Sequence, residues 1–296
     1  MPETEGVHFP LRSRAFPVLP ALVTLVVAGA CAPSSPAPID PTSTPPSAAP
    51  TETPRATPGT TDDEPVRVEV TAGDVTLEVS VPGATLDDPR VHVTPDAQAG
   101  TAAVTLERSV FDDAAGTDGS DGTDGTDGTD GSDDPVVLAL TSRGSFEPRV
   151  DGSVTVRAGD TAVGGLSAPR GARFAAADAT HLEVRPLADA ASGGADDVTT
   201  TLGTRAVERT DWGDREGGRS LAVVPTDWAR TAGQAGTDLV RAELVAADPG
   251  VDTATMHDQL ECHAIGASDK DSWNLEPWRP DVGLVATMAA RCNPTS

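Results

Sequence analysis

Large aromatic side chains are unevenly spread along this chain of 296 residues, and their distribution limits which parts can build a compact core. The chain has no tyrosine and five phenylalanines, and all four of its tryptophans lie in the last third: Trp212, Trp228, Trp273 and Trp278. Tryptophan and phenylalanine rings bury more surface than other apolar side chains. We therefore expect the last third to pack around tryptophan, and any core elsewhere to consist mainly of Val, Leu and Ala.

Acidic residues dominate the charge of the chain. Forty-six Asp and Glu residues outnumber twenty-one Lys and Arg residues, which gives a formal net charge of −25. Nucleic-acid binding needs a basic surface that neutralises phosphate groups, so we expect no nucleic acid among the partners. The same charge disfavours electrostatic adsorption to anionic lipid.

The N-terminus has the layout of a secretory signal. Residues 12–31 read RSRAFPVLPALVTLVVAGAC, with two arginines, a short apolar run and small residues before Cys31. The run is short and interrupted by proline, which disfavours a membrane span. The end of this segment resembles a bacterial lipoprotein signal, although Ala28 stands where leucine is favoured; the alternative is a plain signal peptide. We expect residues 1–30 to be a signal peptide and the secreted lipoprotein to be lipid-anchored through Cys31, on the extracytoplasmic face of the cell membrane.

The segment after the signal favours a tether. Residues 31–65 are rich in Pro, Ser and Thr and contain almost no large apolar residue, which predicts an extended, disordered linker. The chain has three cysteines, and an odd number in an exported protein needs an explanation. If Cys31 carries the lipid, Cys262 and Cys292 remain to form a disulfide bond in an oxidising compartment.

Residues 66–203 show the pattern of half-buried strands. From Val66 the sequence VRVEVTAGDVTLEVSVPG alternates apolar and polar residues between turn signals, and similar segments follow. This pattern predicts an all-β, sandwich-like region. His92 and His181 fall in strand patterns, where we expect structural or exposed side chains.

An acidic insert interrupts the β-rich region. Residues 116–134 repeat Asp and Gly with a period of three, which raises the alternative of a calcium site. Calcium loops require oxygen ligands at alternating positions and a closing glutamate, and this segment has neither. We therefore expect a flexible, disordered surface loop and no metal site.

Residues 204–296 predict a small, disulfide-closed α+β domain, so the whole chain is assigned to the α+β class. A strand is expected over Ser220–Val224, followed by four helices. The helices are predicted to begin at Thr226 or Asp227, at Thr237 or Asp238, at Thr253, and after Asp281 with Val282, Val285 and Met288 or Ala289 inward.

The segment from Cys262 to Cys292, which contains the loop SDKDSWNLEPWRPD, carries the candidate binding residues. Two tryptophans can hold an irregular loop in one shape; we expect Trp273 to be in the core and Trp278 at the surface. A structural role does not explain the polar residues His263, Glu276 and Arg279 in the same segment. With Trp278, these three residues are the candidate binding site, and no catalytic residue can be assigned.

The last third resembles a known family. The motifs Cys262-His263, WNLEPWRP from Trp273 to Pro280, and RCNP from Arg291 to Pro294 are similar to the actinobacterial secreted domain-of-unknown-function family 2599. The resemblance covers about residues 204–294. It implies export and paired cysteines, and it gives no information on activity.

These observations favour a binding or interaction module for a cell-envelope or extracellular ligand, without a cofactor. The alternative is a cell-envelope hydrolase that uses His263 with nearby carboxylates and Arg279. The sequence has no G-x-S-x-G motif, and His257 and His263 lack the spacing of a helical zinc site. We therefore expect a binding protein rather than an enzyme.

Overall fold

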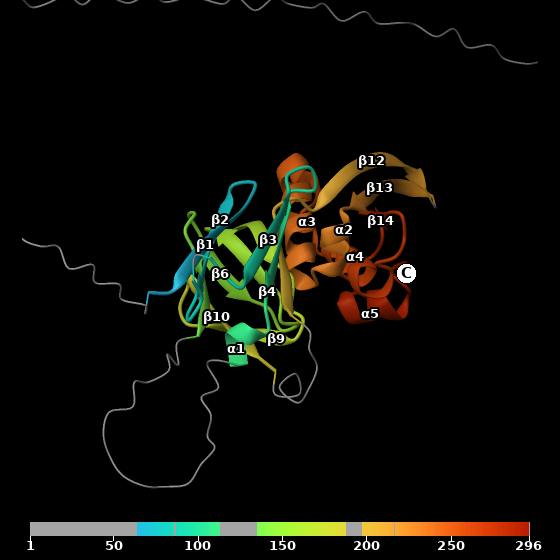
Figure 1. Cartoon of the computed structure of the whole chain (residues 1–296). Helices are drawn as coiled ribbons and strands as arrows, with labels where there is room; N and C mark the ends of the chain where they lie inside the picture. The colour runs from blue at the N-terminus through green and yellow to red at the C-terminus, as the bar shows by residue number, and fades with distance from the viewer. Residues whose placement is uncertain (1–63, 86, 113–134, 188–196, 216, 296) are drawn as a thin grey trace, which may run out of the picture. The chain divides into compact units, whose positions relative to one another are not determined.

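The computed structural model describes residues 64–85, 87–112, 135–187, 197–215 and 217–295. Within them the fold belongs to the α+β class, with antiparallel strands first and most of the helices near the C-terminus (Figure 1). Gly59–Ser296 form one compact unit, and the other unit, Met1–Pro58, lies outside the described residues. The predicted signal peptide, nearly all of the linker and the acidic insert also lie outside them.

The first sheet has five antiparallel strands in the order β1-β2-β5-β10-β9. They are β1 (Val66–Ala72), β2 (Val75–Val81), β5 (Val136–Leu140), β9 (Ala172–Ala176) and β10 (His181–Pro186). In β2 every second residue, from Val75 to Val81, is buried. Because successive side chains of a strand point to opposite faces, the alternation seen in the sequence produces one apolar face.

The second sheet has six antiparallel strands in the order β3-β4-β11-β8-β7-β6. They are β3 (Val91–Asp96), β4 (Thr101–Leu106), β6 (Ser145–Pro148), β7 (Val154–Ala158), β8 (Thr161–Leu166) and β11 (Val198–Gly203), with the short helix α1 (Ser109–Asp112) after β4. His92 in β3 and His181 in β10 have exposed side chains, as expected.

Both sheets contribute side chains to one hydrophobic cluster. Leu77 and Leu138 from the first sheet and Val104 and Leu166 from the second are among its buried members. Phenylalanines 111 and 146 are its only buried aromatic residues in the described part of the chain. The prediction that this core consists mainly of Val, Leu and Ala is therefore confirmed.

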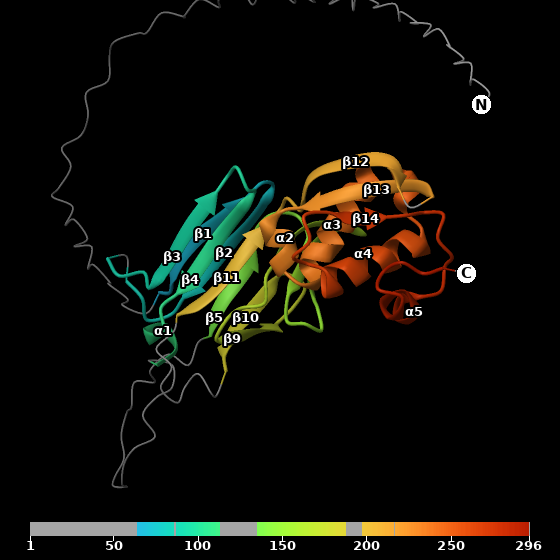
Figure 2. The same cartoon turned by 90° about the vertical axis from the view of Figure 1, so that its right-hand side faces the viewer.

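The C-terminal part combines a three-stranded sheet with helices. The strands are β12 (Val207–Arg215), β13 (Gly218–Pro225) and β14 (Trp273–Leu275), in the order β12-β13-β14. The helices are α2 (Asp227–Thr231), α3 (Gln234–Ala247), the 3-10 turn η2 (Pro249–Val251), α4 (Ala254–Gly266) and α5 (Leu284–Ala289). Helices α3 and α4 lie along this sheet (Figure 2). None of the described helices has the length and apolar character required to cross a membrane.

The core of this part forms around tryptophan, as predicted. Trp228 and Trp273 are buried in a second hydrophobic cluster together with residues of β13, α3 and α4. Trp228 also joins the two parts of the chain, because its indole N–H donates to the Thr201 carbonyl oxygen of β11 at 3.2 Å. The ring lies so close to Gly203 that an added Cβ would be 2.3 Å from it. A glycine is therefore required in β11 at this position.

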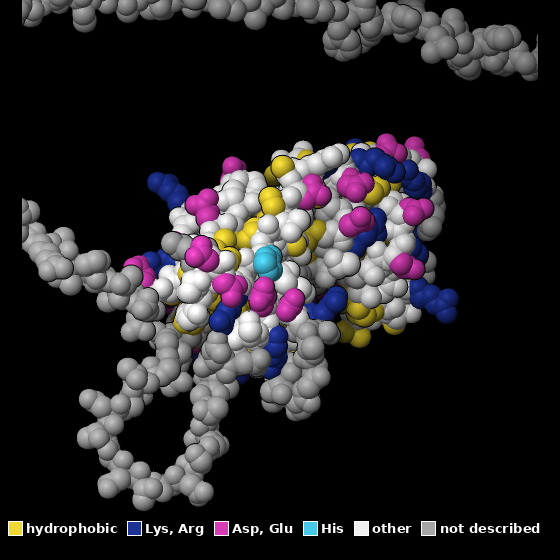
Figure 3. Space-filling view, viewed as in Figure 1, with side chains coloured by type: hydrophobic (Ala, Val, Ile, Leu, Met, Phe, Trp, Pro, Cys, Tyr) yellow, Lys and Arg dark blue, Asp and Glu magenta, His cyan; other side chains and the backbone are white. Residues whose placement is uncertain are grey.

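The predicted inward face of the last helix is wrong. Val285 is 83% exposed, and Val282 and Met288 are also exposed, whereas Thr287 is buried. The Thr287 carbonyl oxygen accepts a hydrogen bond from the backbone N–H of Cys292 at 2.9 Å, so the disulfide side of the helix faces inward. The helix has only six residues and cannot bury a second face. Hydrophobic side chains are accordingly exposed where α5 lies (Figure 3).

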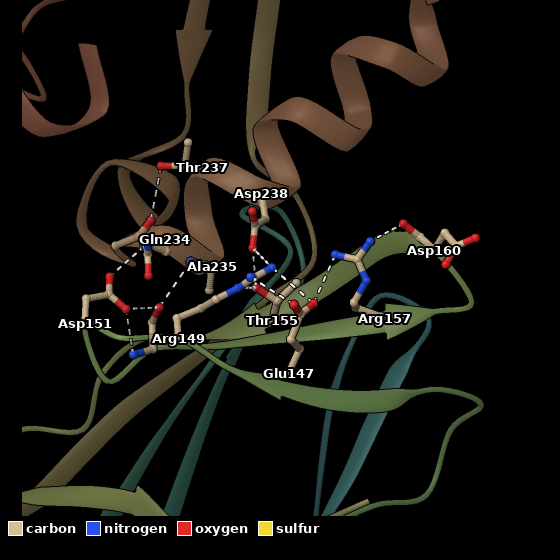
Figure 4. Close-up of polar contacts among 12 residues, drawn as sticks. Glu147, Arg149, Asp151, Thr155, Arg157, Asp160, Gln234, Ala235, Thr237 and Asp238 are labelled. Carbon is tan, nitrogen blue, oxygen red and sulfur yellow. Dashed lines mark hydrogen bonds and ion pairs between the residues drawn. The ribbon is translucent and has the colours of Figure 1, made fainter. Parts of the chain in front are cut away.

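Helix α3 begins at Gln234, earlier than the predicted caps at Thr237 or Asp238. Its first free N–H groups are capped from the β6–β7 turn. The Gln234 N–H donates to Asp151 Oδ2 at 2.7 Å, and the Ala235 N–H donates to Ser153 Oγ at 3.1 Å (Figure 4). A cap supplied by a distant segment replaces the local cap that the sequence pattern indicated.

Asp238 instead takes part in a second contact between the two parts of the chain. Its carboxylate accepts a hydrogen bond from Thr155 Oγ1 at 2.6 Å and forms an ion pair with Arg149 (Figure 4). Arg149 and Thr155 belong to the β6–β7 hairpin. Polar contacts therefore fix α3 against the β-rich region along its first two turns.

Candidate functional site

Helix α4 holds the loop of residues 268–281, here called the tryptophan loop, through the side chain of Gln259. Its Nε2 donates to the Glu276 carbonyl oxygen at 3.0 Å, and the Glu276 N–H donates to its Oε1 at 2.9 Å. The carboxamide thereby pairs with the backbone as a neighbouring strand would. Gln259 is fully buried, so these bonds fix the loop immediately after β14.

His263 lies one turn further along α4 and contacts the same strand. Its Nε2 is 3.0 Å from the Asn274 carbonyl oxygen, and because a carbonyl only accepts, Nε2 carries the hydrogen. Burial lowers the pKa of His263, the bond to Asn274 opposes this in part, and the charge of Lys270 lowers the pKa again. The ring is therefore neutral near pH 7 and serves to position β14.

Glu276 and Arg279 form a buried ion pair. Their side chains are 1% and 3% exposed, and Arg279 Nε donates to Glu276 Oε2. Arg279 Nη1 also donates to the Pro294 carbonyl oxygen at 3.3 Å. The pair ties the loop to the C-terminal segment, and neither charge faces solvent.

Trp278 is the solvent-facing member of the predicted group. It is 44% exposed, and its ring lies over Gly218 of β13, where an added Cβ would be 2.4 Å from the indole. The Arg279 guanidinium lies 4.6 Å from the ring centroid, within the range of a cation–π contact. Trp273 is fully buried and its indole N–H donates to the Ala267 carbonyl oxygen at 3.0 Å. The predicted environments of both tryptophans are confirmed.

The predicted disulfide bond is also confirmed. Cys262 in α4 is bonded to Cys292, and the bridge closes a loop with a sequence separation of 30 residues. Such a loop restricts the unfolded chain by about 3–4 kcal/mol on the chain-entropy estimate. The described residues contain no group of three or more His, Cys, Asp or Glu side chains placed to hold a metal ion.

The four candidate residues His263, Glu276, Trp278 and Arg279 line neither of the two depressions described below. Three of the four are buried and bonded to the backbone or to each other. A depression lies where the β-rich region meets β12 and α2.

This depression, here called the junction groove, has a volume of about 850 Å³. It is lined by the β3–β4 turn, the start of β12 and helix α2: Asp96, Gln98, Ala99, Thr101, Thr201, Arg205, Glu208, Arg209, Thr226, Asp227, Trp228 and Thr231. Hydroxyl and charged groups predominate among them. Two of the lining residues are bonded to each other, because Arg205 Nη1 donates a hydrogen bond to the Gln98 carbonyl oxygen at 3.1 Å.

A second depression of about 480 Å³ adjoins the junction groove. The two share three charged residues, Glu208, Arg209 and Asp227. On the face shown in Figure 3, basic and acidic side chains lie close together over the C-terminal part. The arrangement provides a polar, concave surface of a size typical for ligand sites.

Comparison with known proteins assigns the C-terminal part to a family. Residues 207–295 match the family described as "Protein of unknown function (DUF2599)". The uncharacterized protein Rv0477 of Mycobacterium tuberculosis (strain ATCC 25618 / H37Rv) is 40% identical over 119 residues, which cover 38% of this chain and 80% of that protein. The chain belongs to this family. The uncharacterized protein ML2452 of Mycobacterium leprae (strain TN) is 33% identical over 96 residues, covering 30% and 78% of the two chains. No solved structure matches the chain.

The family domain supplies only part of the junction groove. Glu208, Arg209, Asp227 and three further lining residues belong to the matched segment 207–295, whereas the β3–β4 turn, Thr201 and Arg205 precede it. No sequence motif indicated this groove, because its walls come from separate segments of the chain.

Proposed function

We propose that this protein is an exported, lipid-anchored binding module that holds a polar cell-envelope or extracellular ligand in the junction groove. The observation that carries the proposal is the groove itself, whose walls come from both the β-rich region and the family domain. Its lining offers hydroxyl groups and charges of both signs, which suit a polar ligand.

Two features support a preformed site. Trp228 and the polar contacts of α3 fix the family domain against the β-rich region, which we propose to be a two-sheet sandwich. Because both walls are held in place, a ligand would not have to order the groove on binding. The residues behind the hydrolase alternative are engaged in holding the tryptophan loop, so we propose binding rather than hydrolysis.

The anchor is proposed from the sequence. The signal over residues 1–30, the lipid on Cys31 and the linker over residues 31–65 would hold the compact unit away from the extracytoplasmic face of the membrane. In its own bacterium, the wild-type protein should partition into detergent and the Cys31→Ser variant should not. Equal partitioning of the two proteins would refute the anchor.

Filling the groove tests the binding proposal. Thr231 is an exposed lining residue of α2, so Thr231→Trp should occupy the groove without disturbing the core. The matched control is Thr71→Trp, at an exposed position of β1 that does not line the groove. Both changes are made in the full chain with Cys31→Ser, so that lipid does not contribute to binding.

The measurement is co-sedimentation with cell envelopes purified from the producing bacterium. The parent chain and Thr71→Trp should co-sediment to the same extent. Thr231→Trp should lose at least about tenfold in affinity, which corresponds to about 1.4 kcal/mol. Binding of Thr231→Trp at the parent level, or no co-sedimentation of the parent chain, would refute the proposal.

A further inference from the structure

Strand β12 contains a bulge at the junction groove. Val207 pairs with Pro225 and Arg209 pairs with Val224, so Glu208 is an extra residue without a partner in β13. In a regular strand, consecutive side chains point to opposite faces of the sheet. A bulge interrupts this alternation and redirects side chains, often beside functional sites.

The bulge explains an otherwise unexpected arrangement of two charges. Glu208 and Arg209 are consecutive in the chain, yet both line the junction groove and both line the adjoining depression. Asp227, in the first turn of α2, lines the same two depressions. Two carboxylates and one guanidinium are therefore gathered where the depressions meet.

These three side chains are not used by the fold. All three are exposed, and none has a hydrogen bond or ion pair from its side chain within the described residues. The nearby Arg230 differs, because its guanidinium donates to the carbonyl oxygens of Pro225, Ser268, Lys270 and Asp271. One arginine of the adjoining depression thus holds the structure, and Arg209 stays available to a ligand.

The chemistry of the three groups indicates what they can bind. Carboxylates accept hydrogen bonds from an ammonium group, and a guanidinium binds a carboxylate through two parallel N–H donors. A ligand segment with both kinds of charge side by side would satisfy all three groups at once. A purely cationic segment would leave Arg209 unmatched, and a purely anionic one would meet Glu208 and Asp227.

We propose that Glu208, Arg209 and Asp227 bind a peptide segment in which an ammonium group lies next to a carboxylate. A peptide is favoured because β12 is the outer strand of its sheet, and an outer strand can also pair with an extended backbone. The inference rests on the proposed function of the junction groove and adds the class of ligand. Because the three groups are exposed, binding is weakened by salt.

The test uses capped hexapeptides as probes and the full chain with Cys31→Ser as the protein. The first probe is acetyl-Gly-Lys-Ala-Glu-Ala-Gly-amide, in which Lys and Glu lie on the same face of an extended backbone; in the second, Gln replaces both Lys and Glu. Binding is measured by titration of backbone amide chemical shifts at low salt. The Lys-Glu peptide should bind at least about tenfold more tightly than the Gln-Gln peptide, a ratio equivalent to about 1.4 kcal/mol.

Matched variants identify the residues responsible. Arg209→Gln, and the double variant Glu208→Gln with Asp227→Asn, should each weaken the Lys-Glu peptide at least about fivefold. The control Arg173→Gln changes the same charge at an exposed position of β9 and should bind like the parent chain. The folds are compared by circular dichroism, and because all these side chains are exposed, the spectra should coincide.

Each outcome has a defined meaning. Equal binding of the two peptides, no binding of either, or unchanged binding by Arg209→Gln would overturn the inference. If the peptides fail while Thr231→Trp still abolishes envelope binding, the ligand class is wrong and the proposed function stands. If Thr231→Trp binds envelopes like the parent chain, the proposed function itself fails.

Discussion

Replacing Glu276 by glutamine tests whether the Glu276–Arg279 pair holds the tryptophan loop together. The two side chains are 1% and 3% exposed and bonded to each other. Glutamine preserves the volume and one hydrogen-bond acceptor, but it removes the negative charge that faces the buried Arg279 guanidinium. Removing one partner of a buried pair costs about 3–5 kcal/mol. Because Arg279 also donates to the Pro294 carbonyl oxygen, we expect the lower end of that range.

The assay is urea unfolding of the full chain with Cys31→Ser, followed by circular dichroism. The double variant Glu276→Gln with Arg279→Met removes both charges and should recover part of the lost stability, because the uncompensated buried charge is then gone. The coupling between the two changes is read from the double-mutant cycle. A loss below about 1 kcal/mol for Glu276→Gln, or additive losses in the double variant, would refute the scaffold role.

Three further predictions concern stability. Trp273→Ala should cost about 3–5 kcal/mol because the ring is fully buried, whereas Trp278→Ala, at a ring that is 44% exposed, should cost about 1 kcal/mol; equal losses in denaturant would contradict the assignment of core and surface. The pKa of His263 is lowered in the folded state, so as the pH falls below about 6.5 the unfolded state takes up the proton first and the wild type should lose stability relative to His263→Gln. Parallel pH curves for the two proteins would refute this. Asp151→Ala removes one of the two capping hydrogen bonds of α3 and should cost about 1–2 kcal/mol, with faster hydrogen exchange at the Gln234 amide; unchanged exchange would show that this capping bond is dispensable.

Several elements could be predicted from local sequence patterns. The alternation of valine and leucine indicated β1 and β2, and Thr226 and Thr253 cap α2 and α4 as expected. Strand β11, with the sequence VTTTLG, shows no clear alternation because threonine fills positions on both faces. Strand β14 was missed because three residues are too few to show a period.

Features that depend on distant segments could not be predicted. The start of α3 is set by Asp151, which is 83 residues before its partner Gln234, so no local pattern reports it. Within the tryptophan loop, the burial of Trp273 and the exposure of Trp278 followed from local spacing. The engagement of His263 with the backbone of Asn274 depends on how α4 packs against β14.

The junction groove illustrates the same limit. Its lining residues come from the β3–β4 turn, β11, the start of β12 and α2, and none of these segments carries a recognisable motif. The nearest sequence signal was the pair of opposite charges at Glu208 and Arg209. A regular strand would separate these two side chains, so only the observed bulge brings them to one site.

The central claim, that ligand binds in the junction groove, is tested most directly by locating the bound ligand on the protein. Soluble fragments of the producer's cell envelope are titrated into isotope-labelled full chain carrying Cys31→Ser, and the backbone amide shifts are followed by NMR. We predict that the largest shifts occur at Ala99, Glu208 and Asp227, which line the groove from three different segments. Shifts confined to the loop around Trp278, with the groove amides unchanged, would contradict the account.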